Sequence, residues 1–154
     1  MNNGDSGFTD VKGKRVSKDA DEIMILGAID ETIAALVFAQ SLTKNDSLKD
    51  LVPPLSTIAA IIAGYEHSFP EIYYLNLEKY LSSYDFPHTF SYPFDQPENA
   101  SINLARTSVR KLERILVSYH KKIHFPENIL CYVNRLSTYL YFLQISLISH
   151  SNQE

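Results

Sequence analysis

ILCYVNRLSTYLYFLQISL, residues 129–147, is the stretch that decides the fold. Its apolar side chains recur in alternating steps of four and three residues: Ile129, Val133, Leu136, Leu140, Leu143 and Leu147. This spacing places them on one stripe of a helix, which is the packing pattern of a helical bundle. Pro126, just before the stretch, is suited to the first turn of such a helix. The pattern therefore predicts a long helix that buries one face against other helices.

Four further segments carry helical apolar spacing or helix-start signals. They cover residues 20–42, 47–64, 69–84 and 99–122. Asp19 or Asp21 is expected to cap the first segment. The pair Pro53-Pro54 is expected to open or kink the second segment, because proline lacks an amide donor, and Gly64 to end it. The tyrosines of the third segment leave a strand open as an alternative to a helix there.

These segments together predict an all-α fold of five helices. We expect a single domain over residues 1–154, in which residues 19–150 form an up-down antiparallel bundle. Residues 1–18 hold three of the five glycines and no apolar periodicity, so we expect a glycine-containing loop there.

Composition narrows the class of protein. The 154 residues suffice for one domain with a substantial core. The net charge of -4 argues against general nucleic-acid binding, which usually requires a basic excess. The single Cys131 cannot form an internal disulfide, and no apolar run is long enough to span a bilayer. The N-terminus lacks the apolar segment of a secretory signal. We therefore expect a soluble cytoplasmic protein without nucleic-acid or membrane partners.

ARTSVRKLER, residues 105–114, is the most strongly charged stretch. On a helix Arg106, Arg110 and Arg114 fall at i, i+4 and i+8 and form one stripe, which Glu113 can brace. The stripe is either a solvated face or a set of guanidinium groups that binds an anion. Arginine rather than lysine at all three positions favours the anion, because the planar guanidinium binds oxyanions through two hydrogen bonds.

A second anion-suited element lies near the N-terminus, in NNGDSGFTDVKGKRVSKD, residues 2–19. Successive backbone amides in glycine-rich loops can bind phosphates. The segment offers glycines, hydroxyls and positive charges at Gly4, Gly7, Gly13, Ser6, Thr9, Lys12, Lys14, Arg15 and Lys18. It matches neither the Walker A nor the GxGxxG pattern, and a flexible tail is the alternative interpretation. Asp5 is a candidate to help hold a divalent cation beside phosphates.

Two polar residues lie within the apolar helices. Asp30 lies at the edge of the apolar face of 20–42, where an arginine of the stripe is an available partner. Asn134 flanks the heptad stripe and is either a surface amide or a ligand donor. The histidines show no persuasive spacing for metal ligands, so no protein metal site is expected. No Ser-His-Asp or Cys-His nucleophile system is evident.

Three blocks of this sequence resemble a known family, the ATP:cob(I)alamin adenosyltransferases of the trimeric five-helix-bundle type. The blocks are NGDSGFT with GKRVSKD, then GAIDE, then ARTSVRKLER followed by YVNRLSTYLYFL. They are similar to the family's TGDxGxT with GxRVxKD, its GxVDE segment, and its ARTxxRRAER with LNRLSD. The resemblance implies transfer of the 5′-deoxyadenosyl group of ATP to the cobalt of cob(I)alamin, with release of triphosphate. It also implies Mg²⁺ with the triphosphate, a homotrimer with active sites between subunits, and an adenosylcobalamin-dependent enzyme as a further partner.

The resemblance also implies roles for individual residues. Catalytic roles fall to Arg110, Arg114 and Asp30, the last pairing with Arg110 across a subunit interface. Tyr141 falls where the family has a phenylalanine near the corrin. The residues implied to bind ATP are Asn3, Gly4, Asp5, Ser6, Gly7, Thr9, Lys18, Arg110, Lys111, Glu113, Arg114 and Asn134.

Five features depart from the family pattern. Asn3, Ile33, Lys111 and Thr138 replace a threonine, an asparagine, an arginine and an aspartate, and the 94–103 segment is shorter. These departures keep open a second hypothesis, a non-catalytic ATP/cobalamin-binding carrier or sensor of the same fold. A third hypothesis is a purely structural bundle that binds no nucleotide.

Overall fold

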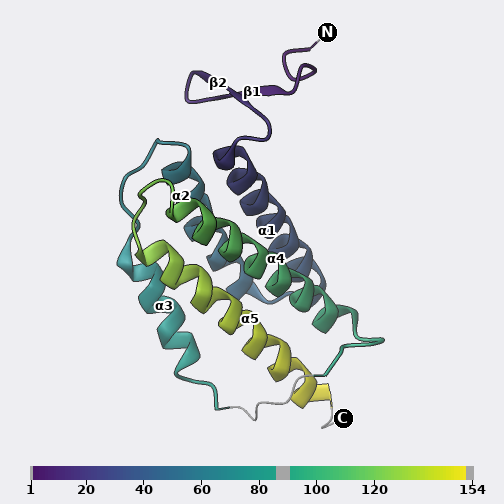
Figure 1. The fold of residues 1–154 in the computed structure, drawn as a ribbon. Helices are drawn as coiled ribbons and strands as arrows, with labels where there is room; N and C mark the ends of the chain where they lie inside the picture. Colours follow the sequence, from purple (N-terminus) through teal and green to yellow (C-terminus); the bar gives the residue numbers. More distant parts are fainter. Residues whose placement is uncertain (1, 86–90, 152–154) are drawn as a thin grey trace.

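The computed structural model describes residues 2–85 and 91–151, with side chains described as far as residue 147. Figure 1 shows a bundle of helices with a short β-hairpin at the N-terminal side. The elements are β1 (Phe8–Val11), β2 (Lys14–Ser17), α1 (Asp21–Thr43), the 3-10 helix η1 (Asp46–Leu51), α2 (Val52–Ile62), α3 (Glu71–Leu81), α4 (Pro97–His120) and α5 (Asn128–Ser151). The predicted five-helix bundle is therefore confirmed.

Successive helices alternate in direction (Figure 1), and specific contacts fix their register. Lys122, just after α4, pairs with Asp21 at the start of α1, at 3.0 Å. The other end of α4 meets the far end of α5, because Asn99 Nδ2 donates to the Gln144 carbonyl at 3.2 Å. Helix α4 therefore runs antiparallel to both neighbours and lies between them.

The predicted apolar stripe of α5 forms one side of the core. Five of its six members are buried, and the sixth, Leu147, is partly buried against the same cluster. On α4 the buried apolar residues are Ile102, Ala105, Val109, Leu112, Leu116 and Tyr119. Because that apolar face is turned inward, the charged face of α4 is left toward solvent.

Helix ends follow the sequence signals in part. Pro53 and Pro54 lie in the first turn of α2, and Gly64 follows its end with φ of +86°. The expectation that Asp19 or Asp21 caps α1 was wrong. Ala20 is the N-cap residue and makes no side-chain cap hydrogen bond. Asp19 accepts a hydrogen bond from the Ser17 hydroxyl instead, and Asp21 is already helical.

The tyrosine-rich segment is a helix rather than a strand. Its aromatic rings pack on α5: the Phe69 and Tyr132 centroids lie 5.3 Å apart, and those of Tyr80 and Tyr139 lie 5.6 Å apart. Burial against a neighbouring helix thus overrides the β propensity of the tyrosines.

The predicted N-terminal loop is in part a β-hairpin. Phe8 pairs with Ser17 and Val11 with Lys14 in antiparallel register. Lys12 and Gly13 make the turn with φ of 48° and 74°. Two consecutive residues with positive φ match the twist of a tight hairpin, so this turn sets the pairing. The hairpin stands beyond the N-terminal end of α1 (Figure 1). Within the described ranges, no helix is long and apolar enough to cross a membrane.

Candidate functional site

An open hollow of about 270 Å³ lies between α4 and α5. Arg106 and Arg110 of α4 form one wall, and Ser137, Thr138 and Tyr141 of α5 form the other. The two arginines are one helical turn apart on the solvent face of α4, which the apolar packing of that helix leaves outside. The antiparallel register brings them opposite the hydroxyl-bearing turn of α5. The hollow thus combines two cations, three hydroxyls and one aromatic ring.

The two arginines make this hollow electropositive. Arg106 is partly buried, and its Nε and Nη2 atoms donate to Asn103 Oδ1 at 3.2 and 2.9 Å. Burial lowers the pKa of Arg106 from its usual value, and the nearby positive charge of Arg110 lowers it further. Arg110 itself is exposed. An anion placed between the two guanidinium groups would relieve their repulsion, so the hollow is suited to an oxyanion.

The remaining charged residues of the stretch 105–114 differ in exposure and in their ion-pair partners. Arg114 is exposed one turn beyond Arg110. Glu113 is partly buried, but no ion pair joins it to a stripe arginine within the described ranges, so the expected brace is absent there. Lys111 turns toward α1 and pairs with Glu31 at 3.1 Å. Lys111 is therefore not part of the hollow in this chain.

The predicted residues of α5 lie along its solvent side. Asn134 is exposed, one turn before the hollow, and its backbone carbonyl accepts the hydroxyls of Ser137 and Thr138 at 2.9 and 3.3 Å. Tyr141 is partly buried and lines the hollow, with its ring 5.8 Å from that of Phe142. The structure thus brings Arg110 and Tyr141 together and places Asn134 next to them.

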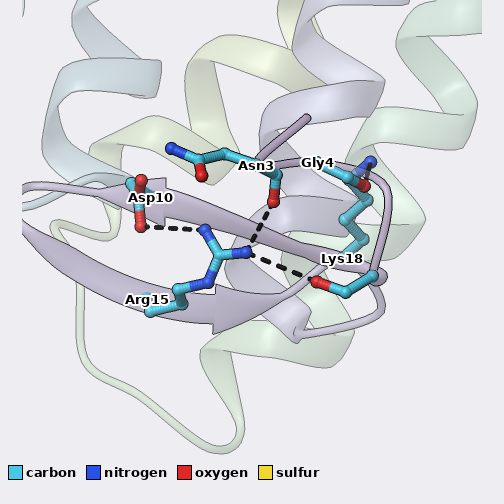
Figure 2. A network of polar contacts seen from close by, with 6 residues as sticks. Asn3, Gly4, Asp10, Arg15 and Lys18 are labelled. Carbon is cyan, nitrogen blue, oxygen red and sulfur yellow. Dashed lines mark hydrogen bonds and ion pairs between the residues drawn. The ribbon is translucent and has the colours of Figure 1, made fainter. Parts of the chain in front are cut away.

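The N-terminal segment is held by two basic side chains of the hairpin region (Figure 2). Arg15 Nη2 donates to the Asn3 carbonyl at 2.5 Å and to Ser6 Oγ at 3.4 Å, while Nη1 lies 3.5 Å from Asp10 Oδ1. Lys18 Nζ donates to the Gly4 carbonyl at 2.7 Å. These cations fold the predicted phosphate-binding residues into a compact loop beside the hairpin.

Backbone turns complete this loop. The Asn2 amide donates to Asp5 Oδ2 at 2.8 Å, and the Asp5 amide donates to the Asn2 carbonyl at 3.0 Å. Gly7 has φ of +83°, and its carbonyl accepts the Lys18 amide at 2.9 Å. Thr9 lies on β1. Lys18, the Asp5 carboxylate and several hydroxyls therefore lie within one short segment, a composition that suits a polyphosphate with a cation.

The loop and the hollow lie far apart within one chain. Lys122 marks the end of α4 that lies beside the start of α1, next to the hairpin. Arg110 precedes it by twelve residues, which is roughly 18 Å along a helix at about 1.5 Å per residue. The phosphate-binding loop and the hollow therefore lie at different levels along α4 within one chain.

Asp30 lies outside the hollow. It is exposed on α1, and no ion pair within the described ranges involves it. The exposed surface of the same helix also carries large apolar side chains: Met24 is 54% exposed, Val37 56% and Phe38 49%. Acidic and apolar groups thus lie together on the exposed surface of α1. Contact with water alone does not explain why large apolar side chains are exposed there.

Three residues of the hollow, Arg106, Ser137 and Thr138, were not chosen as ligands from the sequence. Arg106 was part of the predicted stripe, and its spacing of four from Arg110 was the available signal. Ser137 gave no signal, because its place depends on the register between α4 and α5.

Comparison with known proteins identifies the family. Residues 1–147 match the family model described as cobalamin adenosyltransferase. The chain belongs to this family. The corrinoid adenosyltransferase PduO of Salmonella typhimurium is 25% identical over 97% of this chain and 49% of its own length. A corrinoid adenosyltransferase of Bacillus subtilis is 28% identical over 90% of this chain and 80% of its own length. The chain thus spans about half the length of the PduO relatives it matches, which include one from Citrobacter freundii at 47%.

Solved structures of the family share the fold. A variant PduO-type ATP:corrinoid adenosyltransferase from Lactobacillus reuteri, complexed with ATP, superposes with a TM-score of 0.76 at 20% identity. That match covers 92% of this chain and 89% of the other. A second variant of the Lactobacillus reuteri protein, complexed with cobalamin and ATP, superposes with the same TM-score of 0.76 at 21% identity, over 92% of this chain and 88% of the other. The family's bundle is therefore retained in this divergent chain.

Proposed function

We propose that this protein transfers the 5′-deoxyadenosyl group of ATP to the cobalt of cob(I)alamin and releases triphosphate. The observation that carries the proposal is the electropositive hollow of Arg106 and Arg110 opposite Tyr141, in a chain of the cobalamin adenosyltransferase family. ATP and cobalamin are both substrates.

The proposed reaction places specific demands on the protein. The reduced cobalt of the substrate supplies the electron pair that forms the Co–C5′ bond. The C5′–O bond breaks, and its electron pair leaves with the triphosphate. Negative charge therefore grows on the leaving group, and preorganised cations stabilise it without reorganisation. Arg110 and Arg114 carry this role in the proposal, with Lys18 and the N-terminal amides around the far phosphates. No protein nucleophile is required.

Residues of α5 would orient the substrates at the hollow. Asn134 is exposed beside it and supplies an amide for the nucleotide. Tyr141 lines the hollow and provides an apolar ring toward the corrin, in a position where excluding water protects the reduced cobalt. Thr138, another wall residue, offers a hydroxyl to either substrate.

The donor set fits Mg²⁺ held chiefly by the nucleotide. Mg²⁺ commonly binds through one or two carboxylates together with substrate phosphates. Asp5 is the carboxylate of the phosphate-binding loop, and its Oδ2 accepts only a backbone amide among the hydrogen bonds of the described ranges. When bound there, Mg²⁺ would neutralise part of the triphosphate charge, while the cations of this chain bind the remainder.

The active site is proposed to form between subunits of a homotrimer. The wide separation of the phosphate-binding loop from the hollow supports this, because a second copy can bring its loop to the first copy's hollow. The exposed Val37 and Phe38 of α1 supply apolar area for such an interface. Asp30, on the same helix, would pair there with Arg110 of the neighbouring copy. The proposal also places the protein in the cytoplasm, where it would deliver adenosylcobalamin to a dependent enzyme.

The decisive test is turnover of cob(I)alamin under strict anaerobic reduction with ATP and Mg²⁺. Loss of the cob(I)alamin absorbance is expected with the parent protein and is expected to collapse with Arg114→Ala. Lys122→Ala is the control, because it removes a positive charge just after the same helix but outside the arginine stripe. ATP binding by calorimetry without turnover would contradict the transferase and favour the carrier or sensor. No ATP binding at all would favour the structural bundle.

Complementation tests the shared active site. Lys18→Ala removes the phosphate-binding loop's lysine, and Arg114→Ala removes a stripe arginine, so each variant alone is expected to be inactive. When the two variants are unfolded and refolded together in equal amounts, about a quarter of interfacial sites combine an intact loop with an intact stripe, as random pairing at head-to-tail interfaces requires. Recovery of activity near that fraction supports the interfacial site. Activity no higher than that of the separate variants would contradict it.

A further inference from the structure

A second cavity lies on another part of the bundle and shares no lining residue with the arginine hollow. It measures about 370 Å³ and opens between the η1–α2 junction and α3. Its volume lies within the range of roughly 300–1,000 Å³ that small-molecule sites occupy. The lining residues are Asp50, Leu51, Pro53, Pro54, Tyr73, Asn76, Leu77, Tyr80 and Tyr132.

The lining has a single sign of charge. Asp50 is the one charged residue among the lining residues, and no lysine, arginine or histidine lines the cavity. A helix N-terminus usually attracts anions through its free amides, but Pro53 and Pro54 occupy the first turn of α2 and have no amide N–H. The cavity therefore offers neither a cationic side chain nor those amides to an anion.

Aromatic rings make up much of the wall. Tyr73, Tyr80 and Tyr132 all contribute to it. The faces of tyrosine rings attract cations through their quadrupole, and the attraction grows when the cation is partly desolvated. Three tyrosines beside one carboxylate are therefore complementary to an organic cation with an apolar body.

One buried hydroxyl at this wall is left without a partner. Tyr132 is 1% exposed, and its hydroxyl makes no hydrogen bond within the described ranges. Burial raises the pKa of Tyr132 above its usual value, so the hydroxyl stays neutral and able to donate at ordinary pH. A buried polar group without a partner costs free energy, and a ligand or water that reaches it would recover part of that cost.

We propose that this cavity is a binding site for a small organic cation, of the quaternary or primary ammonium class. Asp50 supplies the counter-charge, the tyrosines enclose the cationic head, and the prolines and leucines contact its apolar part. The same carboxylate disfavours the triphosphate of ATP. The site is thus separate from the proposed transfer chemistry, and it stands or falls independently of it.

Choline and 3,3-dimethyl-1-butanol provide a matched pair of probes, because they share a shape and differ in the charge of one atom. Each is titrated into the full chain and followed by amide chemical shifts in ¹H–¹⁵N NMR. Choline is expected to give saturable shifts at the residues that line the cavity, with an affinity about fivefold or more above that of the neutral isostere, as cation–π and carboxylate contacts predict.

Two variants test the assignment of the groups. Asp50→Asn keeps the shape and removes the charge, and Tyr80→Leu removes a ring that is already 38% exposed, so both are expected to fold and to bind choline more weakly. Asp46→Asn is the control: it removes an acid of the same 3-10 helix that pairs with Lys49 outside the cavity, and its choline affinity should match the parent. Equal binding of both probes, shifts confined to other residues, unchanged affinity in Asp50→Asn, or no saturable shift at millimolar choline would each overturn the proposal.

Discussion

Replacing Arg110 by alanine should separate function from stability. Arg110 is exposed, lines the hollow, and has no ion pair within the described ranges. Its positive charge lowers the pKa of Arg106, so the two side chains repel each other. Truncating Arg110 relieves that repulsion, which for residues four apart on a helix amounts to about 0.2–0.5 kcal/mol. The free energy of unfolding of the single chain should therefore stay within about 0.5 kcal/mol of the parent value, with any change toward higher stability, whereas loss of the proposed pair with Asp30 of a neighbouring copy should weaken assembly.

Catalysis should respond in the opposite direction. A hydrogen bond to a charged group contributes about 1.5–3 kcal/mol. If Arg110 donates one such bond to the developing triphosphate, its loss lowers kcat/KM for ATP by about 10- to 150-fold, since about 1.4 kcal/mol corresponds to a factor of ten. The assay is the initial rate of cob(I)alamin consumption across a range of ATP concentrations, together with urea unfolding of the same preparations.

Two comparisons make the result interpretable. Arg110→Lys keeps the charge but loses the planar fork, so its kcat/KM should fall between those of the parent and Arg110→Ala. Lys122→Ala should change neither the rate nor the stability by more than a surface substitution does. A rate for Arg110→Ala within about threefold of the parent, less than one charge-assisted hydrogen bond supplies, would refute the assignment. A large loss of single-chain stability would refute the statement that Arg110 makes no stabilising ion pair within its own chain.

Two further predictions concern the hairpin and the buried tyrosine. Lys12 Nζ donates to the Gly64 carbonyl and lies 5.7 Å from the Tyr65 ring centroid, so Lys12→Ala should speed amide hydrogen exchange in the hairpin by about fivefold, the loss of about 1 kcal/mol. Unchanged protection would show that this contact does not hold the hairpin. Tyr132→Phe removes an unpaired buried hydroxyl and should leave stability at pH 7 unchanged or raised by about 1 kcal/mol in urea unfolding. Burial raises the pKa of Tyr132 in the folded protein. Below about pH 10, the usual tyrosine pKa, the hydroxyl is neutral in both the folded and the unfolded chain; as the pH rises further, the unfolded chain ionises first and the free energy of unfolding falls. The variant should therefore lose less stability than the parent in alkaline titration, and equal losses would contradict this.

Much of the bundle could be predicted from local patterns. The apolar stripe of α5 and the spacing in α1 and α4 predicted helices whose observed bounds differ by about two residues, the usual uncertainty of helix ends. These predictions succeed because a helix with one apolar stripe has few ways to bury it. The hairpin was missed because two four-residue strands carry too little periodicity, and the left-handed turn at Lys12 lacks the usual asparagine or aspartate. The cap of α1 was wrong because Asp19 has a competing local partner in Ser17.

In the candidate site, too, spacing along the helix predicted some residues, while packing between helices decided the partners of others. Arg110 and Arg114 could be selected from sequence, because spacing along one helix puts them on one face. The implied role of Lys111 in ATP binding stays a prediction: the next residue on a helix points about 100° away, so Lys111 does not line the hollow and pairs with Glu31 of α1. Within the described ranges, Glu113 forms no ion pair with the stripe, which residue type alone did not indicate.

The sequence by itself determined the elements: five helices, one arginine stripe and one glycine-containing segment, because these depend on neighbours within a few residues. Only the tertiary structure decided what those elements face. The antiparallel register of α4 and α5 set Ser137 and Tyr141 opposite the arginines, and the placement of η1 and α3 around one cavity set Asp50 beside tyrosines. Such contacts join residues distant in the chain, and their positions follow from how apolar faces pack rather than from any local signal.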